Sequence, residues 1–177
     1  MSLYIIASLS NEDKIKLEKP LSIFKNNAYG GTIEDSSALH ITIREAYKDD
    51  TNHSLAISVL QEFEKMKFHK FKVAVNKFCR FEDNQVDWLG MDNSFPLYQI
   101  KKSLDDIAVK LGYQFMNENF NGYTPHITIG FNNTVNQNAL VDFEPIPITV
   151  DNICLFGYDN EVNHVHVSDM LYRVNLI

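Results

Sequence analysis

The tetrapeptide His-Ile-Thr-Ile occurs twice in this chain, at residues 40–43 and 126–129. In a β-strand, successive side chains point to opposite faces, so histidine and threonine share one face and the two isoleucines share the other. The isoleucines of each copy can therefore enter a hydrophobic core while the imidazole and the hydroxyl stay on the open face. The repeat predicts two equivalent strands, each presenting an imidazole and a hydroxyl from a rigid support.

Similar elements precede each copy, which indicates an ancient duplication into two lobes of α+β type. The expected strands cover residues 3–9, 39–44, 71–81, 86–90, 126–131, 146–156 and 164–175. A first helix is expected from Asn11, with Pro20 ending or restarting it. Two longer amphipathic helices are expected over residues 51–66 and from a cap at Ser94 to a stop at Gly112.

Composition and length are those of an ordinary globular protein. The 177 residues are 45% hydrophobic and 22% charged, which fits a single domain of two lobes over residues 1–177. No apolar run approaches the roughly 20 residues that span a bilayer, and the first residues lack the pattern of a signal peptide. Cys79 and Cys154 belong to no paired motif, so a reducing, cytoplasmic location without a membrane partner is expected.

Charge is unevenly distributed along the chain. The net charge of −7 argues against a protein that coats long nucleic acid. Residues 65–80 nevertheless hold six basic side chains and no acidic one. This segment is either a solvated surface or a basic rim that receives a phosphate-bearing ligand. A small or short substrate fits this balance better than a long duplex.

Two imidazoles on facing strands suit the chemistry of a phosphodiester. Histidine changes its charge near neutral pH, so one ring can act as base toward the nucleophile and the other as acid toward the leaving oxygen. We assign His40 as the acid and His126 as the base, with the reverse assignment open. Thr42 and Thr128 can donate hydrogen bonds to the phosphoryl oxygens, and Arg44 can neutralise developing charge. This chemistry requires no metal and no cofactor.

These residues resemble the 2H phosphoesterase superfamily, and especially its 2′-5′ RNA ligase-like (LigT-like) branch of cyclic phosphodiesterases. That family is defined by two His-apolar-Thr/Ser-apolar motifs, which residues 40–43 and 126–129 match. The similarity extends to residues 71–75, 78–81, 86–90, 111–112 and 124–126, and covers the chain from about 1 to 175. The resemblance implies an α+β fold of two pseudo-symmetric lobes, with antiparallel sheets around a central groove and helices on the outer faces.

The resemblance also implies an activity. Members of the family hydrolyse 2′,3′-cyclic phosphates, open ADP-ribose cyclic phosphate or cut 2′-5′ oligoadenylate, and some join RNA ends weakly. Carried over by position, His40 and His126 are catalytic, and Thr42 and Thr128 hold the phosphate. The expected partner is a nucleotide or an RNA end bearing a cyclic phosphate or a 2′-5′ linkage. The oligomeric state is open, with a monomer as the expectation.

Residues beside the second motif complete the predicted site and leave two alternatives. Thr124 extends its polar face, and Tyr123 is the preferred aromatic residue for stacking on a nucleobase. Relatives that act on RNA often place basic residues beside this motif, where the chain has Gly130 and Phe131. This departure favours, as an alternative, a nucleotide- or RNA-end-binding protein that lacks turnover. The other alternative is a zinc site on His164 and His166, for which the sequence supplies no third ligand.

Overall fold

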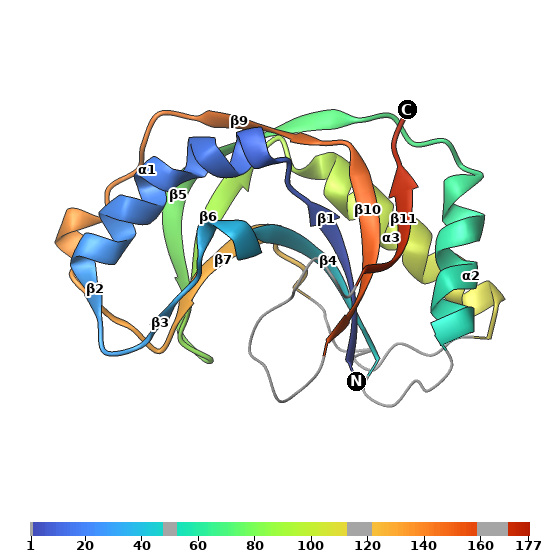
Figure 1. The fold of residues 1–177 in the computed structure, drawn as a ribbon, viewed down its shortest axis with the longest axis horizontal. Helices are drawn as coiled ribbons and strands as arrows, with labels where there is room; N and C mark the ends of the chain where they lie inside the picture. The colour runs from blue at the N-terminus through green and yellow to red at the C-terminus, as the bar shows by residue number, and fades with distance from the viewer. Residues whose placement is uncertain (1, 48–52, 113–121, 159–169) are drawn as a thin grey trace.

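The computed structural model describes residues 2–47, 53–112, 122–158 and 170–177, and these form a mixed α+β fold (Figure 1). One antiparallel sheet has the strand order β11-β10-β1-β4. Its strands are β1 (Ser2–Ser8), β4 (His40–Tyr47), β10 (Asn152–Tyr158) and β11 (Met170–Asn175). This sheet forms the core of the first lobe, and β4 is one of its two edge strands.

A second antiparallel sheet has the order β3-β7-β6-β5-β9 and forms the core of the second lobe. Its strands are β3 (Thr32–Ile33), β5 (Phe71–Phe81), β6 (Val86–Asp92), β7 (His126–Phe131) and β9 (Ile146–Val150). A short pair, β2 (Ala28–Tyr29) with β8 (Thr134–Val135), and two 3-10 turns, η1 (Ser36–Ala38) and η2 (Gln137–Ala139), complete the described strands and turns.

The helices lie on the outside of the two lobes, as Figure 1 shows. Helix α1 (Asn11–Asn27) packs against β9, and α2 (His53–Glu64) packs against α3 (Phe95–Lys110) and β11. Gly112 follows α3 with a φ of 72°, the left-handed conformation predicted for its stop. The predicted fold class, antiparallel sheets with helices on their outer faces, is confirmed. Among the described helices, none is long and apolar enough to cross a membrane.

Helix α1 corrects the expectation that Pro20 would end or restart it. The helix begins after Ser10, whose hydroxyl accepts a hydrogen bond from the Asp13 amide, and continues unbroken to Asn27. Pro20 lacks the amide that would bond to the preceding turn, which is normally destabilising. Its ring lies on the buried face with Leu17 and Phe24, so apolar burial offsets the missing hydrogen bond.

The predicted strand over residues 146–156 is in fact two strands in different sheets. β9 ends at Val150 in the second lobe, and β10 begins at Asn152 in the first. The Asn152 side chain is buried and binds Ser8 on both sides, accepting from its amide at 3.3 Å and donating to its carbonyl at 3.1 Å. Ser8 is paired with His40, so this crossing also fixes the start of the first repeat strand.

Alternation in the two repeat strands is as predicted. Ile41, Ile43, Ile127 and Ile129 are each at most 1% exposed and belong to the central hydrophobic cluster. Their histidine and threonine neighbours are half-buried on the opposite face. The isoleucines therefore hold each strand against the core and turn the polar pair of each copy outward.

Candidate active site

The two repeat strands bring their polar faces to one cavity of about 830 Å³. β4 and β7 approach each other where the two sheets meet, without joining into one sheet. His40 and Thr42 line the cavity from the first lobe, and His126 and Thr128 line it from the second. Two imidazoles and two hydroxyls from distant parts of the chain thus face a shared space.

Both imidazoles are held in the same way by the backbone. Nδ1 of His40 lies 2.8 Å from the Ala38 carbonyl oxygen, and Nδ1 of His126 lies 2.6 Å from the Thr124 carbonyl oxygen. A carbonyl can only accept a hydrogen bond, so Nδ1 carries the proton in each ring. The neutral tautomer then has its lone pair on Nε2, which is left for exchanging a proton with a bound molecule. The two copies match in geometry as well as in sequence.

The cavity also adjusts the acidity of the two rings. Burial lowers the pKa of both His40 and His126 below the ordinary histidine value, and the carbonyl hydrogen bond acts in the opposite direction. The pKa of His40 is lowered further by the nearby charges of His126 and Lys14. Both rings therefore favour the neutral form near pH 7, and an anionic phosphate between them would favour adding a proton to one.

Tyr123 and Thr124 lie where the chain enters the second repeat strand. The Tyr123 hydroxyl donates a hydrogen bond to the Thr42 carbonyl at 3.2 Å, which joins the two lobes beside the cavity. Its ring packs edge-on against Tyr98, with centroids 5.3 Å apart. Thr124 lines the cavity and supplies the carbonyl that holds His126. Contacts of both its hydroxyl and its ring thus hold Tyr123 in the wall of the cavity.

Positive charge enters the cavity from the first lobe. Arg44 lies beyond Thr42 on β4 and is 8% exposed, and Lys101 projects from α3. Both cations meet Asp105, with Arg44 Nε 3.4 Å from Oδ1 and Lys101 Nζ 2.6 Å from Oδ2. Lys101 was not predicted from the sequence. The available signal was its position one turn after the buried Leu97, on the edge of the apolar stripe of α3.

The second lobe surrounds its histidine with aromatic rings. The centroid of the His126 ring lies 5.1 Å from that of Phe81 and 5.6 Å from that of Trp88. Phe81 and Trp88 stack on each other at 4.8 Å. The charged residues that line the cavity from this side, Glu34 and Asp83, are acidic. The two lobes therefore offer different surroundings to the same motif.

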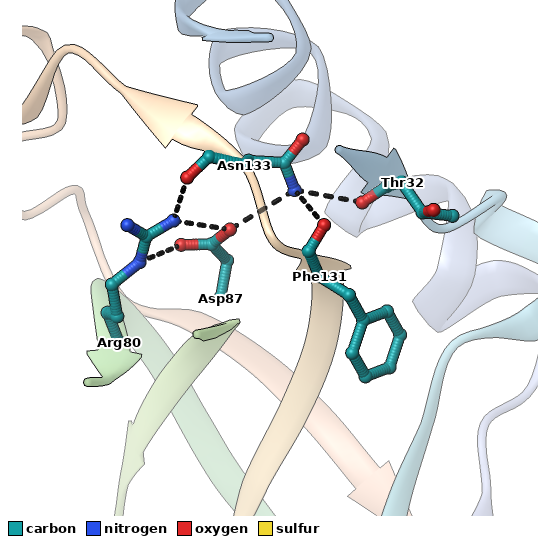
Figure 2. Close-up of polar contacts among 5 residues, drawn as sticks. All are labelled: Thr32, Arg80, Asp87, Phe131 and Asn133. Atoms are coloured by element: carbon teal, nitrogen blue, oxygen red, sulfur yellow. Dashed lines mark hydrogen bonds and ion pairs between the residues drawn. The ribbon is translucent and has the colours of Figure 1, made fainter. Parts of the chain in front are cut away.

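A buried polar network fixes the cavity wall at the far end of β7 (Figure 2). Arg80 forms two hydrogen bonds with Asp87, at 2.8 and 3.0 Å, and a third with the Asn133 carbonyl. The side-chain amide of Asn133 donates hydrogen bonds to the Thr32 carbonyl at 2.8 Å and to the Phe131 carbonyl at 3.2 Å. Asp87 and Asn133 are each 3% exposed. The network therefore ties the two-residue strand β3 to the end of β7.

The same network explains Gly130, which follows the second motif. A Cβ at this position would lie 2.5 Å from Asn133 Nδ2 and 2.8 Å from the Thr32 carbonyl oxygen. These contacts are far shorter than a carbon atom tolerates. A basic side chain cannot stand at position 130 in this fold unless the network moves.

The basic segment over residues 65–80 is not the rim of this cavity. Arg80 is committed to Asp87, and Lys65 pairs with Glu62 on the surface at 2.5 Å. The described lining of the cavity includes no residue between 65 and 80. His164 and His166 lie outside the described residues. Within the described part of the chain, no group of three His, Cys, Asp or Glu side chains could hold a metal ion.

Comparison with known proteins agrees with this arrangement. The family model described as "2′-5′ RNA ligase superfamily" matches residues 19–162. The chain belongs to the 2′-5′ RNA ligase superfamily. This superfamily is one of 2H phosphoesterases. No curated protein sequence matches the chain.

Solved structures show the same fold for this superfamily member. A protein described as a phosphoesterase has a TM-score of 0.71 at 16% identity, covering 99% of this chain and 98% of its own. E. coli LigT without ligand has a TM-score of 0.72 at 16% identity, covering 99% and 96%. TT0787 of Thermus thermophilus has a TM-score of 0.76 at 12% identity, covering 99% and 98%. At these identities the likeness concerns the fold.

Proposed function

We propose that this member of the 2′-5′ RNA ligase superfamily is a metal-independent phosphodiesterase. Its substrates are 2′,3′-cyclic phosphates or 2′-5′ phosphodiester bonds in RNA ends or small nucleotides. The observation that carries the proposal is the pair of imidazoles with matching backbone anchors, His40 and His126, in one cavity. Nucleotide substrates are consistent with E. coli LigT, which forms crystalline complexes with 3′-AMP, ATP and NADP+.

The reaction divides into two proton transfers around one phosphorus atom. One neutral imidazole takes a proton at Nε2 from the attacking water as the new P–O bond forms. The other imidazole, protonated, gives its Nε2 proton to the leaving ribose oxygen as the old P–O bond breaks. The sequence assigns His126 as the base and His40 as the acid. Exchanging the two roles leaves the two proton transfers balanced. After turnover the two protonation states are exchanged, and proton transfer through water restores them.

The remaining polar groups serve the phosphoryl oxygens. The Thr42 and Thr128 hydroxyls share the cavity face with the two rings and can donate hydrogen bonds to the non-bridging oxygens. The tautomer that each backbone carbonyl imposes matters because it presents Nε2, not Nδ1, to the substrate. Arg44 adds positive charge to the lining of the cavity.

A panel of substrates tests the proposal. Nucleoside 2′,3′-cyclic phosphates, 2′-5′ dinucleotides and ADP-ribose cyclic phosphate are each incubated with the wild-type protein and with His126→Ala. At least one substrate should be hydrolysed by the wild-type protein in the presence of EDTA, and the variant should be inactive on it. Activity that disappears on chelation and returns with added zinc would contradict the two-histidine mechanism.

The alternative is a protein that binds nucleotides in the same cavity without turnover. Glu34 and Asp83 in the lining, and the absence of a side chain at Gly130, favour it because they reduce positive charge near the phosphate. Nucleotide affinity that survives both His40→Ala and His126→Ala, with no product from any member of the panel, would select this alternative.

A further inference from the structure

The carbonyl that anchors the His40 ring belongs to a short turn, η1, that two charged side chains hold. The turn ends at Ala38, whose carbonyl oxygen lies 2.8 Å from Nδ1 of His40. Asp35 caps the start of η1 by accepting a hydrogen bond from the Ser37 amide at 2.9 Å. The Lys14 ammonium donates a hydrogen bond to the carbonyl of the same serine. Both charged groups thus fix the residue that precedes the anchor of the ring.

Lys14 reaches this turn from near the start of α1, which packs against η1. The ammonium is partly withdrawn from water, since burial lowers the pKa of Lys14 and the charge of Asp35 acts in the opposite direction. A charge in such a place is maintained by polar partners, here the Ser37 carbonyl and the Asp35 carboxylate. The helix therefore holds the η1 turn through one of its own side chains.

The same side chain brings a positive charge near one of the two imidazoles. The pKa of His40 is lowered by burial first and then by the charges of His126 and Lys14. The pKa of His126 is lowered by burial and raised by its bond to the Thr124 carbonyl. The other titratable residues that line the cavity around the rings are Tyr4, Glu34, Arg44, Asp83, Lys101 and Tyr123. Lys14 thus acts on the ring of the first lobe.

We propose that Lys14 is a positioning residue for His40, acting through the η1 turn that anchors the ring. This inference rests on the proposed function for its effect on turnover, but the effect on the ring is independent of that function. If η1 loosens, the Ala38 carbonyl no longer fixes Nδ1, and Nε2 loses its alignment with the substrate. Such misalignment slows the chemical step more than it weakens binding, because catalysis depends closely on the geometry of the reacting groups.

Four variants separate the contact from the charge. Lys14→Met removes both the donor to the Ser37 carbonyl and the cation near His40, and Lys14→Arg restores both. Asp35→Ala removes the other hold on η1 but no cation. Lys25→Met is the matched control, because Lys25 is an exposed lysine of the same helix whose charge also reaches Asp35.

Kinetics on the substrate found in the panel measures the effect on turnover. In Lys14→Met and Asp35→Ala, kcat should fall roughly five- to fiftyfold with KM nearly unchanged. One limb of the pH profile of kcat/KM should move up by about half a pH unit in Lys14→Met and stay in place in Asp35→Ala. Lys14→Arg should restore both values, and Lys25→Met should change neither. A wild-type kcat and pH profile in Lys14→Met would show that the contact serves stability alone and would refute the proposal.

Nitrogen NMR of the imidazoles, recorded without substrate, tests the positioning independently of turnover. His40 should be in the Nδ1–H tautomer in the wild-type protein and should gain a larger share of the Nε2–H tautomer in Lys14→Met, while His126 keeps its Nδ1–H tautomer. His40→Asn assigns the signal. This change, together with no hydrolysis of any substrate in the panel, would refute the proposed activity and keep the positioning role. An unchanged His40 tautomer in folded Lys14→Met would refute the positioning role, whether or not the protein hydrolyses a substrate.

Discussion

The two His-Ile-Thr-Ile strands have the same sequence and the same ring anchors, but their surroundings differ. In the first lobe, His40 lies near Lys14, and Arg44 and Lys101 bring positive charge to the cavity. In the second lobe, His126 packs against the rings of Phe81 and Trp88. The repeated motif thus supplies the same imidazole and hydroxyl to both sides of the cavity. The residues around each copy determine whether charged or aromatic groups surround them.

The reason for the difference lies in the packing behind each strand. The end of β7 is fixed by Arg80, Asp87 and Asn133 (Figure 2). A side chain at Gly130 would collide with Asn133 and with the Thr32 carbonyl. At the corresponding position of β4, Arg44 has room to extend toward Asp105. In the second lobe the polar side chains fix β7, whereas in the first lobe Arg44 lines the cavity. We expect the following changes to break this division or to sharpen it.

The largest effect on kcat should come from replacing the histidine that each lobe contributes to the cavity. His40→Asn and His126→Asn should each lower kcat by about 10²- to 10⁴-fold, because each removes one proton transfer at the same phosphorus atom. The double variant should be no more than a few-fold slower than the slower single variant, because groups that act as a unit do not contribute additively. Single-turnover rates with the substrate found in the panel measure this. If the fold-loss in the double variant equals the product of the losses in the two single variants, the two rings act independently.

The next effect concerns the second lobe alone. Arg80→Met should lower the free energy of unfolding by about 3 kcal/mol, because it leaves the buried Asp87 carboxylate without its cation. The matched surface change, Lys65→Met, should cost at most about 0.5 kcal/mol, since Lys65 and Glu62 are both well exposed. Urea unfolding of the two variants gives the comparison. Similar losses in both would mean that the network in Figure 2 contributes little to stability.

A smaller effect is expected at the contact between the lobes. Tyr123→Phe removes the hydroxyl that donates to the Thr42 carbonyl and should cost about 1 kcal/mol of stability. Because this bond positions one repeat strand against the other, kcat should fall several-fold while KM changes little. Tyr98→Phe keeps the ring contact with Tyr123 and serves as the control. A rise in KM without a change in kcat would instead assign Tyr123 to substrate binding.

Much of this arrangement could be predicted from the repeated tetrapeptide. The alternation of isoleucine with histidine and threonine was sufficient to place Ile41 and Ile127 in the core and His40 and His126 on a common cavity. Period-two patterns are reliable because one face of such a strand must be buried. The duplication predicted two lobes, and the resemblance to the 2H phosphoesterase superfamily implied antiparallel sheets around a central groove.

Features that depend on tertiary contacts could not be read in this way. Residues 146–156 were predicted as one strand although the polar Asp151 and Asn152 interrupt its apolar residues. The pairing of each half with a different sheet shows the break at Asp151. Lys101 and Lys102 have identical helical partners in the sequence, and the packing of α3 decides which of them faces the cavity. The number of basic residues at 65–80 was the reason to consider this segment as a rim for a phosphate-bearing ligand, but none of them lines the cavity.

The smallest effect separates the two histidines by their electrostatic surroundings. Burial lowers the pKa of both rings in the folded state, so the unfolded chain binds more protons as the pH falls through about 6.5. The histidines therefore make the folded protein lose stability as the pH falls from about 7.5 to about 5.5, and replacing either ring should reduce this loss. His40→Asn should reduce it more than His126→Asn, because Lys14 lowers the pKa of His40 in addition to burial, whereas the repulsion between the two histidines is lost in either variant. Urea midpoints of the wild-type protein and both variants at the two pH values measure the difference, and contributions from other histidines cancel. A larger change for His126→Asn would show that the aromatic rings of the second lobe, not the charges of the first, dominate the acidity of the pair.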